Sequence, residues 1–353
     1  MNATYLAASI ASIFTAVVLS PSIALADPPG DPRGVGDPRF VPASVENACN
    51  SLELAATGGP VPHDKKTLVV RWLGYATFEL TYGDKVILLD NYYYRGPRYR
   101  DLGFKVEDVR RADAIIIGHG HFDHMSDSAQ VAIQTGAPIV GAPITTTKLL
   151  SQAVNPAQVI TVTGKGGELL HFDGFTVQPV LGRHGEPPAF TAAFGAAYTA
   201  AIPAPTPEQA AIEASIRAKG SSDSHILDQG TIAYIITFDT GFRLAYRDSG
   251  GIMTDYEKAA MQQHGRVDVL LGAIAANVIA ESQATVLMPM VENYRPVVFF
   301  PGHHEEEIGG KVDRATEPMF QYIKNEFPDT VTVSKEFREP TCFDTRRNLS
   351  NNH

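Results

Sequence analysis

The chain has 353 residues, enough to bury a large core, and its composition of 44% hydrophobic and 19% charged residues is that of a folded protein. Its formal net charge of −10 argues against nucleic acid or an anionic membrane surface as the main partner. A small anionic substrate stays open, because local clusters and metal ions can override the net charge.

The first 26 residues carry no charged side chain. An apolar stretch from about Leu6 to Leu19 is followed by Ala24-Leu25-Ala26, a small-x-small pattern typical of the point where a secretory signal is cleaved. We therefore expect residues 1–26 to be a signal peptide and the mature protein to be periplasmic or secreted. The basic region that normally precedes such a stretch is missing, so an uncleaved membrane anchor is the alternative.

Residues 27–64 are rich in Pro, Gly and Asp with little periodicity, which predicts an extended N-terminal arm. Cys49 lies in this arm, and Cys342 lies in a C-terminal tail predicted over residues 339–353. In an oxidising compartment the two could form a disulfide that ties the extensions together, with two unpaired thiols as the alternative. Neither cysteine is near the His/Asp clusters, so neither is predicted to bind metal.

From residue 67 the pattern changes to short strands separated by turns. Strands are predicted at 68–72, 78–81, 86–90, 114–117, 159–162, 169–172, 175–180, 232–238, 242–246, 267–271 and 297–300. Helices are predicted at 127–134, ending before Gly136, and at 207–219, with Thr206 as the cap. Two successive sets of strands with helical connections predict an α/β (four-layer αββα) sandwich of two mixed sheets flanked by helices, as one domain over residues 65–338.

The strand predicted at 114–117 leads into GHGHFDH, a motif with three imidazoles and one carboxylate within six residues. On a loop that leaves a strand, His119 and His121 can point one way while Asp123 and His124 turn toward a second point. Nitrogen and oxygen ligands grouped like this suit one or two divalent metals, zinc best, with manganese or iron as alternatives. The motif therefore predicts a metal site.

Two other segments could shape a substrate pocket. Residues 91–100 read NYYYRGPRYR, and their rings and cations could stack on or pair with a substrate; a solvated loop whose rings cover the core is the alternative. Residues 185–230 form a long insertion that predicts either a lid or a surface decoration. The substrate contacts singled out in these segments are Tyr93, Arg95, Arg98 and Phe190.

Three further potential metal ligands, His184, Asp248 and His303, each follow the end of a different predicted strand. Any one of them alone could be an ordinary loop residue, but side chains from several strand ends can converge on the GHGHFDH motif. His304, next to His303, is the alternative at that position.

The residues around these positions resemble a known family. Arg71–Phe78 reads RWLGYATF, with Tyr75 where the family usually has His. Val86–Asp90 matches a strand that ends in an Asp, and His119–Asp127 matches the signature H-x-H-x-D-H followed by a helix. The chain thus resembles the metallo-β-lactamase-fold hydrolases, in particular a branch similar to ascorbate-6-phosphate lactonase, over roughly residues 67–309.

The resemblance implies the metallo-β-lactamase fold and a binuclear metal centre. One metal would be held by His119, His121 and His184, the other by Asp123, His124 and His303, with Asp248 bridging and Asp90 supporting the ligands. Arg247 stands where the family usually has Gly, and we expect it to add bulk and charge beside the bridge.

Two such metals would lower the pKa of a shared water, and Asp123 would orient the resulting hydroxide and shuttle its proton. In the family that the chain resembles, lactonases, thioester hydrolases and phosphodiesterases commonly have a bridging carboxylate, whereas true β-lactamases generally lack it. Ester or lactone hydrolysis is therefore ranked above β-lactam hydrolysis. The sequence therefore predicts an exported metal-dependent hydrolase of a small ester, lactone or related xenobiotic. A phosphodiesterase or phospholipase-type enzyme is the second hypothesis, with the arginines of residues 95–100 binding phosphate. A β-lactamase or a metal-dependent binding protein without turnover is less favoured.

Overall fold

The computed structural model describes residues 40–41, 46–185, 204–221, 230–274, 286–304 and 317–347. All of them belong to one unit, Pro38–His353. The predicted signal peptide and Phe190 lie outside the described residues. Within the described part of the chain, no helix has the length and apolar character needed to cross a bilayer.

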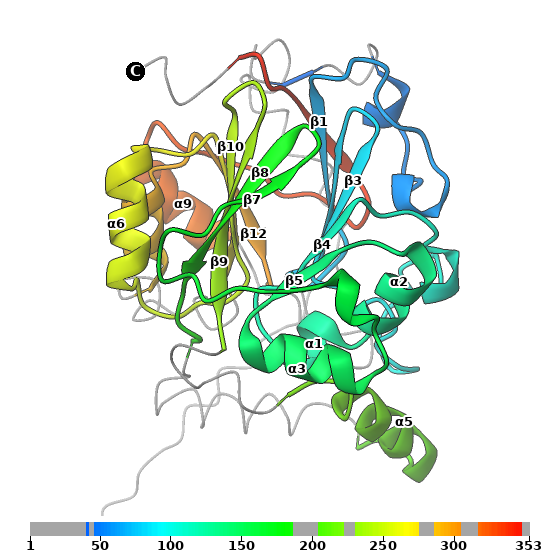
Figure 1. Ribbon diagram of the computed structural model, residues 1–353. Helices are drawn as coiled ribbons and strands as arrows, with labels where there is room; N and C mark the ends of the chain where they lie inside the picture. The colour runs from blue at the N-terminus through cyan, green and yellow to red at the C-terminus, as the bar shows by residue number, and fades with distance from the viewer. Residues whose placement is uncertain are drawn as a thin grey trace, which may run out of the picture. The chain divides into compact units, whose positions relative to one another are not determined.

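Two mixed sheets lie at the centre of this unit (Figure 1). The first has the order β14-β1-β2-β3-β4-β5-β6, with β1 (Thr67–Trp72), β2 (Phe78–Tyr82), β3 (Lys85–Leu89), β4 (Ala114–Ile116), β5 (Ile139–Gly141), β6 (Val159–Thr161) and β14 (Pro340–Asp344). The second has the order β13-β12-β11-β10-β9-β8-β7, with β7 (Leu170–Phe172), β8 (Phe175–Leu181), β9 (Ile232–Phe238), β10 (Arg243–Arg247), β11 (Val269–Ala273), β12 (Val298–Gly302) and β13 (Val331–Thr332).

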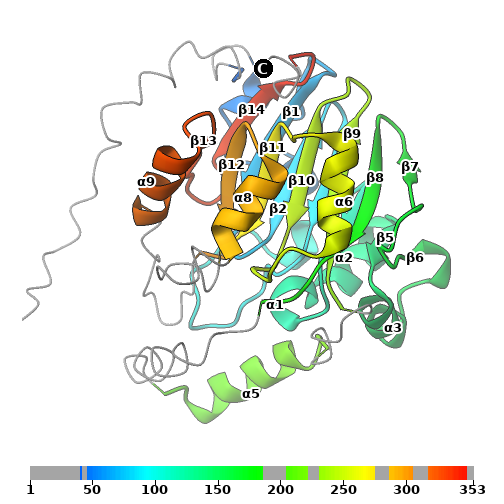
Figure 2. The same cartoon turned by 90° about the vertical axis from the view of Figure 1, so that its left-hand side faces the viewer.

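Helices cover the outer side of the second sheet, which faces the viewer in Figure 2, and others lie beside the first sheet (Figure 1). On the side of the first sheet lie α1 (Phe122–Met125), α2 (Ser128–Thr135) and α3 (Pro143–Ser151), and on the side of the second lie α6 (Asp255–His264), α8 (Met288–Tyr294) and α9 (Glu317–Glu326). Helix α5 (Pro207–Arg217) belongs to the insertion and lies next to α1. Short 3-10 helices are η1 (Asn47–Cys49), η2 (Ala55–Thr57), η3 (Val106–Asp108) and η4 (Pro156–Gln158). The predicted αββα sandwich is confirmed.

The strand directions explain where side chains can converge. Strands β3, β4 and β5 run parallel, so their carboxyl ends share one edge of the first sheet. In the second sheet β8 and β10 are both antiparallel to β9, and β10, β11 and β12 are parallel to one another. The carboxyl ends of β8, β10 and β12 therefore share an edge as well. The backbone bridge between His119 and Thr231 joins these two edges.

The folded unit extends beyond the limits of 65 and 338 that the sequence indicates. Strand β14 pairs with β1 along its whole length, although its five residues begin with Pro and end with Asp and carry no clear strand signal. At the other end, residues 46–64 pack on the first sheet instead of forming an extended arm. The buried carboxylate of Glu79 accepts the backbone N–H groups of Ala55 and Ala56 and pairs with Arg71 at 3.3 Å.

A disulfide joins Cys49 and Cys342, which are separated by 293 residues of chain. Such a cross-link restricts the unfolded chain more than the folded one. Replacing both cysteines with Ala should lower the free energy of unfolding by about 2–5 kcal/mol, as measured by urea denaturation. Reductant should have the same effect on the wild type and none on the double variant. Equal stability of the two proteins without reductant would show that the cross-link contributes nothing.

Candidate metal centre

Seven potential ligands come together where the two shared sheet edges meet. His119 and the rest of the motif follow β4, while His184, Asp248 and His303 follow β8, β10 and β12. Their side chains form three overlapping groups in which the potential ligand atoms all lie within 4.8 Å of one another. The groups are His119, His121 and His184; Asp123, His124 and His303; and His119, His124 and Asp248.

The first group consists of histidines alone. The ring centroids lie 4.7 Å apart for His119 and His121, 4.7 Å for His119 and His184, and 4.6 Å for His121 and His184. His119 Nε2 and His121 Nδ1 approach to 3.1 Å, and both belong to this group. Three imidazoles around one point are a donor set typical of zinc.

The second group places a carboxylate between two imidazoles. Asp123 Oδ2 lies 3.2 Å from His303 Nε2 and 3.8 Å from His124 Nε2. Asp123 and His303 are partly exposed, whereas His124 is buried. This group is therefore open to solvent on the side of Asp123 and His303.

Asp248 links the two groups, because it lies close to one histidine of each. Its Oδ2 atom lies 2.5 Å from His119 Nδ1 and 3.3 Å from His124 Nδ1. Its Oδ1 atom is buried and accepts no hydrogen bond from any described residue. A buried carboxylate oxygen without a hydrogen-bond partner costs free energy unless a cation contacts it. The donor atoms of the site therefore fit a bound metal ion.

Asp90 lies beside His124, directly after β3, where the resemblance implies a residue that supports the ligands. Its backbone has φ of 48°, and its Oδ2 lies 2.5 Å from His124 Nδ1 while its Oδ1 accepts the N–H of Gly118. The contact with Nδ1 leaves His124 Nε2 to face the second group. A carboxylate behind a histidine in this way fixes the tautomer and the orientation of the ring.

The charges of the site also fit a bound cation. Burial and the nearby carboxylate of Asp90 raise the pKa of Asp248 well above its usual range. Burial opposes protonation of His124, but the carboxylates of Asp123 and Asp90 outweigh it and raise its pKa to about 9. Burial and the neighbouring histidines lower the pKa of His119. A divalent ion bound here would take the place of these protons. It would stabilise the carboxylates in their ionised form and leave the imidazoles neutral.

The structure distinguishes the two adjacent histidines after β12. The His303 ring faces Asp123, whereas the buried His304 ring stacks on Trp72 with centroids 4.1 Å apart. Burial and His303 lower the pKa of His304 to about 3. His303 therefore lies among the potential ligands, and His304 packs in the core.

This difference gives a testable pair of variants. Replacing His303 with Ala should weaken binding of the second of two metal equivalents by more than about 10-fold, because it removes a ligand. Replacing His304 with Phe should leave both equivalents in place, since a ring can still stack on Trp72. Titration of the metal-free proteins with zinc measures both, and a greater loss of metal in the His304 variant would reverse the assignment.

Arg247 was expected to add bulk beside Asp248, but its side chain points away from Asp248. The reason is that neighbouring residues of extended backbone point to opposite faces of the sheet. Its buried guanidinium bonds to Glu257 of α6 at 2.8 Å and to the carbonyl of Gly251 at 2.5 Å. It therefore holds the loop after Asp248 against α6.

The predicted substrate contacts of residues 91–100 are engaged within the protein. Tyr93 is buried and its hydroxyl donates to Asn91, while the buried Arg95 donates to the carbonyls of Leu73 and Tyr92. Arg98 makes two hydrogen bonds, of 2.5 and 2.8 Å, with Glu213 of α5. These contacts match the alternative interpretation, in which the segment supports the core. Phe190 lies outside the described residues.

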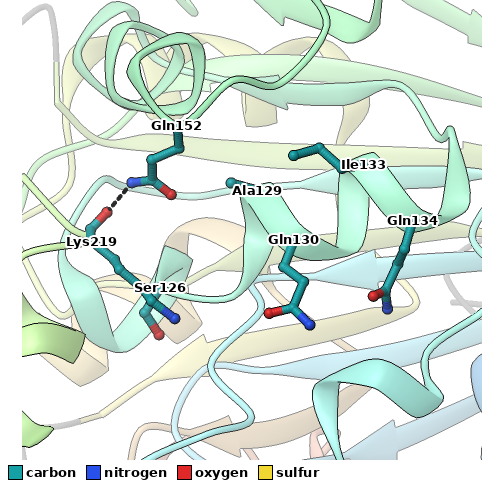
Figure 3. Close-up of a pocket in the computed structure, with 7 residues that line it drawn as sticks. All are labelled: Ser126, Ala129, Gln130, Ile133, Gln134, Gln152 and Lys219. Carbon is teal, nitrogen blue, oxygen red and sulfur yellow. Dashed lines mark hydrogen bonds between the residues drawn. The ribbon is translucent and has the colours of Figure 1, made fainter.

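A separate depression of about 400 Å³ lies beside α2 (Figure 3). It is lined by Ser126, Ala129, Gln130, Ile133, Gln134, Gln152 and Lys219. Gln152 donates to the carbonyl of Lys219 at 2.6 Å, so the depression marks where the end of the insertion meets α3. It contains none of the ligands.

The insertion is fixed to the motif by contacts that the sequence analysis missed. Ser221 N donates to the carbonyl of Gly120 at 2.6 Å, and the guanidinium of Arg217 lies 4.4 Å from the centroid of the Phe122 ring. The capping residues of α5 were recognisable in the sequence, but nothing there shows on which surface the helix packs.

Comparison with known proteins places this geometry in context. Residues 69–303 match the family model described as the β-lactamase superfamily domain. The UPF0173 metal-dependent hydrolase of Agrobacterium fabrum is 33% identical over 110 residues, which cover 30% of this chain and 43% of that protein. Its counterpart in Thermoplasma volcanium is 27% identical over 113 residues, or 32% and 46% of the two chains. The matches thus span less than half the length of these curated relatives.

Two solved structures share the fold. Igni18, a metallo hydrolase from the archaeon Ignicoccus hospitalis, is 16% identical with a TM-score of 0.54, over 78% of this chain and 98% of that one. A possible metal-dependent hydrolase from Veillonella parvula is 15% identical with a TM-score of 0.50, over 77% and 98%. At these identities the likeness extends to the fold alone.

Proposed function

The chain belongs to the β-lactamase superfamily, and from this premise we propose that it is an exported, binuclear metal-dependent hydrolase of a small ester or lactone. Membership confirms the superfamily to which the sequence was assigned, and the αββα sandwich is its metallo-β-lactamase fold. The observation that carries the proposal is the convergence of six ligands into two groups of three, with Asp248 between them.

The metals would be divided between the two groups. His119, His121 and His184 would bind one ion, and Asp123, His124 and His303 the other, with the carboxylate of Asp248 contributing to both. When bound, such ions supply Lewis acidity and a water of lowered pKa. Zinc suits the nitrogen-rich set best, with manganese or iron as the alternatives.

Asp123 is the residue that we propose to move the proton. It is partly exposed on the open side of the second group. Its partial burial raises its pKa, but His124 and His303 outweigh this effect and hold the pKa of Asp123 below its usual range. It is therefore ionised at neutral pH and can accept a hydrogen bond from the attacking water and then its proton. The buried Asp248 has no such access.

The arginines support the choice of an ester or lactone over a phosphodiester. Arg98 is paired with Glu213, Arg100 lies 3.5 Å from Glu336, and Arg95 is buried against carbonyl groups. The guanidinium groups that the phosphodiesterase hypothesis requires are thus already paired with carboxylates or buried. An uncharged ester or lactone needs none of them.

The disulfide supports export. Cross-links between cysteines persist in oxidising compartments and are rare in the reducing cytosol. The bond between Cys49 and Cys342 therefore fits a periplasmic or secreted protein, in line with the signal peptide expected from the sequence.

Substrate class is tested by assaying one zinc-loaded preparation with a panel of aryl esters and lactones and with a bis-aryl phosphate. We expect kcat/KM for the best ester or lactone to exceed that for the phosphodiester by at least about 100-fold, equivalent to about 2.7 kcal/mol of transition-state stabilisation. The same preparation stripped by a chelator should lose turnover and regain it with zinc. A preference for the phosphodiester would overturn the proposed substrate class.

A further inference from the structure

His303 differs from His119 and His124 in how its ring is held. The Nδ1 atoms of His119 and His124 each lie 2.5 Å from a carboxylate, which fixes those rings. His303 Nδ1 is buried and has no hydrogen-bond partner among the described residues. Some other contact must therefore orient His303.

Tyr75 supplies that contact through its backbone and its ring. The carbonyl of Tyr75 accepts the N–H of His303 at 2.6 Å and the indole N–H of Trp72 at 2.8 Å. Its ring meets the His303 ring edge to face, with centroids 5.0 Å apart and planes at 70°. Both residues have a left-handed backbone, φ of 49° and 54°, which is costly for side chains of this size and persists only when neighbours impose it.

The other side of Tyr75 is packed against elements distant in sequence. Its ring meets that of Tyr92 at 5.1 Å, and the Arg95 guanidinium lies 4.9 Å from its centroid. Tyr75 and Tyr92 form one buried apolar cluster with Ile216 of helix α5, which also contacts the partly buried Ile212. Tyr75 thus lies between the insertion and the second ligand group.

We propose that Tyr75 is a positioning residue: it holds His303 in the orientation that completes the second metal site, and it connects that site to helix α5 of the insertion. Helix α5 of the insertion then stabilises the second metal site through its contact with Tyr75. This inference depends on the proposed function only in that Asp123, His124 and His303 bind a metal.

The contacts predict which part of the side chain matters. The edge-to-face contact and the cation–π contact with Arg95 use the ring, and the hydrogen bond from His303 uses the backbone. The hydroxyl group bonds to Tyr99 and not to His303. Tyr75→Phe should therefore keep the second metal within about 3-fold of the wild-type affinity. Tyr75→Ala should weaken it by about 10–100-fold, the range typical of residues that orient metal ligands. The first metal, held by three other histidines, should be unaffected by either change.

The experiment is a cobalt titration of the metal-free full-length protein, followed by visible absorption and by calorimetry. Ile216→Ala, which leaves Tyr75 and every ligand in place, should weaken the second cobalt about 3-fold or more, because it loosens the cluster behind Tyr75. Ser215→Ala, on the exposed side of the same helix, is the matched control and should bind as the wild type does. Circular dichroism establishes that each variant is folded, and if Tyr75→Ala fails to fold, Ile216→Ala carries the test.

Two results would overturn the inference: wild-type affinity for both cobalt ions in folded Tyr75→Ala and Ile216→Ala, or an equal loss of affinity for both ions. The readout needs no turnover. A protein that hydrolyses no ester but shows the selective loss contradicts the proposed substrate and retains the role of Tyr75. A protein that hydrolyses esters but shows no selective loss of the second cobalt ion contradicts the role of Tyr75 and retains the proposed substrate class.

Discussion

Replacing Asp123 with Asn should lower kcat by about 10²–10⁴, the contribution typical of a general base in position. Asparagine preserves the shape of the side chain but cannot take a proton. The carboxylate lies 3.2 Å from His303 Nε2, so the change should also weaken the second metal. Assays at saturating zinc separate the two effects, because excess metal restores occupancy but not the base.

The matched control is Asp255→Asn, which changes the same chemical group on the exposed surface of α6. It should retain wild-type kcat. Wild-type turnover by the Asp123 variant at saturating zinc would exclude Asp123 as the base and leave that role unassigned among the described residues.

Replacing Gly118 with Ala should abolish binding of at least one metal. A Cβ atom at this position would lie 2.1 Å from Cγ of Asp248, far inside van der Waals contact. The backbone cannot move away easily, because Gly118 N donates to Asp90 and its carbonyl accepts the N–H of Ile232. Asp248 must therefore move, at a cost of about 1–3 kcal/mol in the free energy of unfolding.

Gly182→Ala is the control for this variant. Gly182 lies two residues before His184, and its Cβ would meet the Thr231 methyl group at an ordinary distance of 3.4 Å. We expect this variant to retain two metals, measured by elemental analysis, and its thermal midpoint. If Gly118→Ala also retains both, the close approach of Gly118 to Asp248 has no bearing on metal binding.

Much of the site was predictable because its ligands follow strand ends. The GHGHFDH motif has local spacing that can be read directly, and the sheet topology then brings in His184, Asp248 and His303. The fold was predictable because buried runs of β-branched residues, such as that of β4, are separated in the sequence by clear turn residues.

What the sequence did not predict depends on tertiary packing. Residues 91–100 look like a pocket wall by composition, yet Arg95 and Arg98 are held by carbonyls and by Glu213, contacts that no local pattern encodes. Strand β14 begins with Pro and ends with Asp, and only its pairing with β1 identifies it as a strand. The contact of Tyr75 with His303 joins residues 228 positions apart, which only the folded chain brings together.

The most direct test of the binuclear centre is the metal content of folded protein, measured by elemental analysis after removal of loosely bound ions. We predict about two equivalents of divalent metal per wild-type chain, falling in Asp248→Ala because that variant loses the proposed bridge. Metal content near zero in wild-type protein that is folded by circular dichroism, and that takes up no added zinc, would contradict the account.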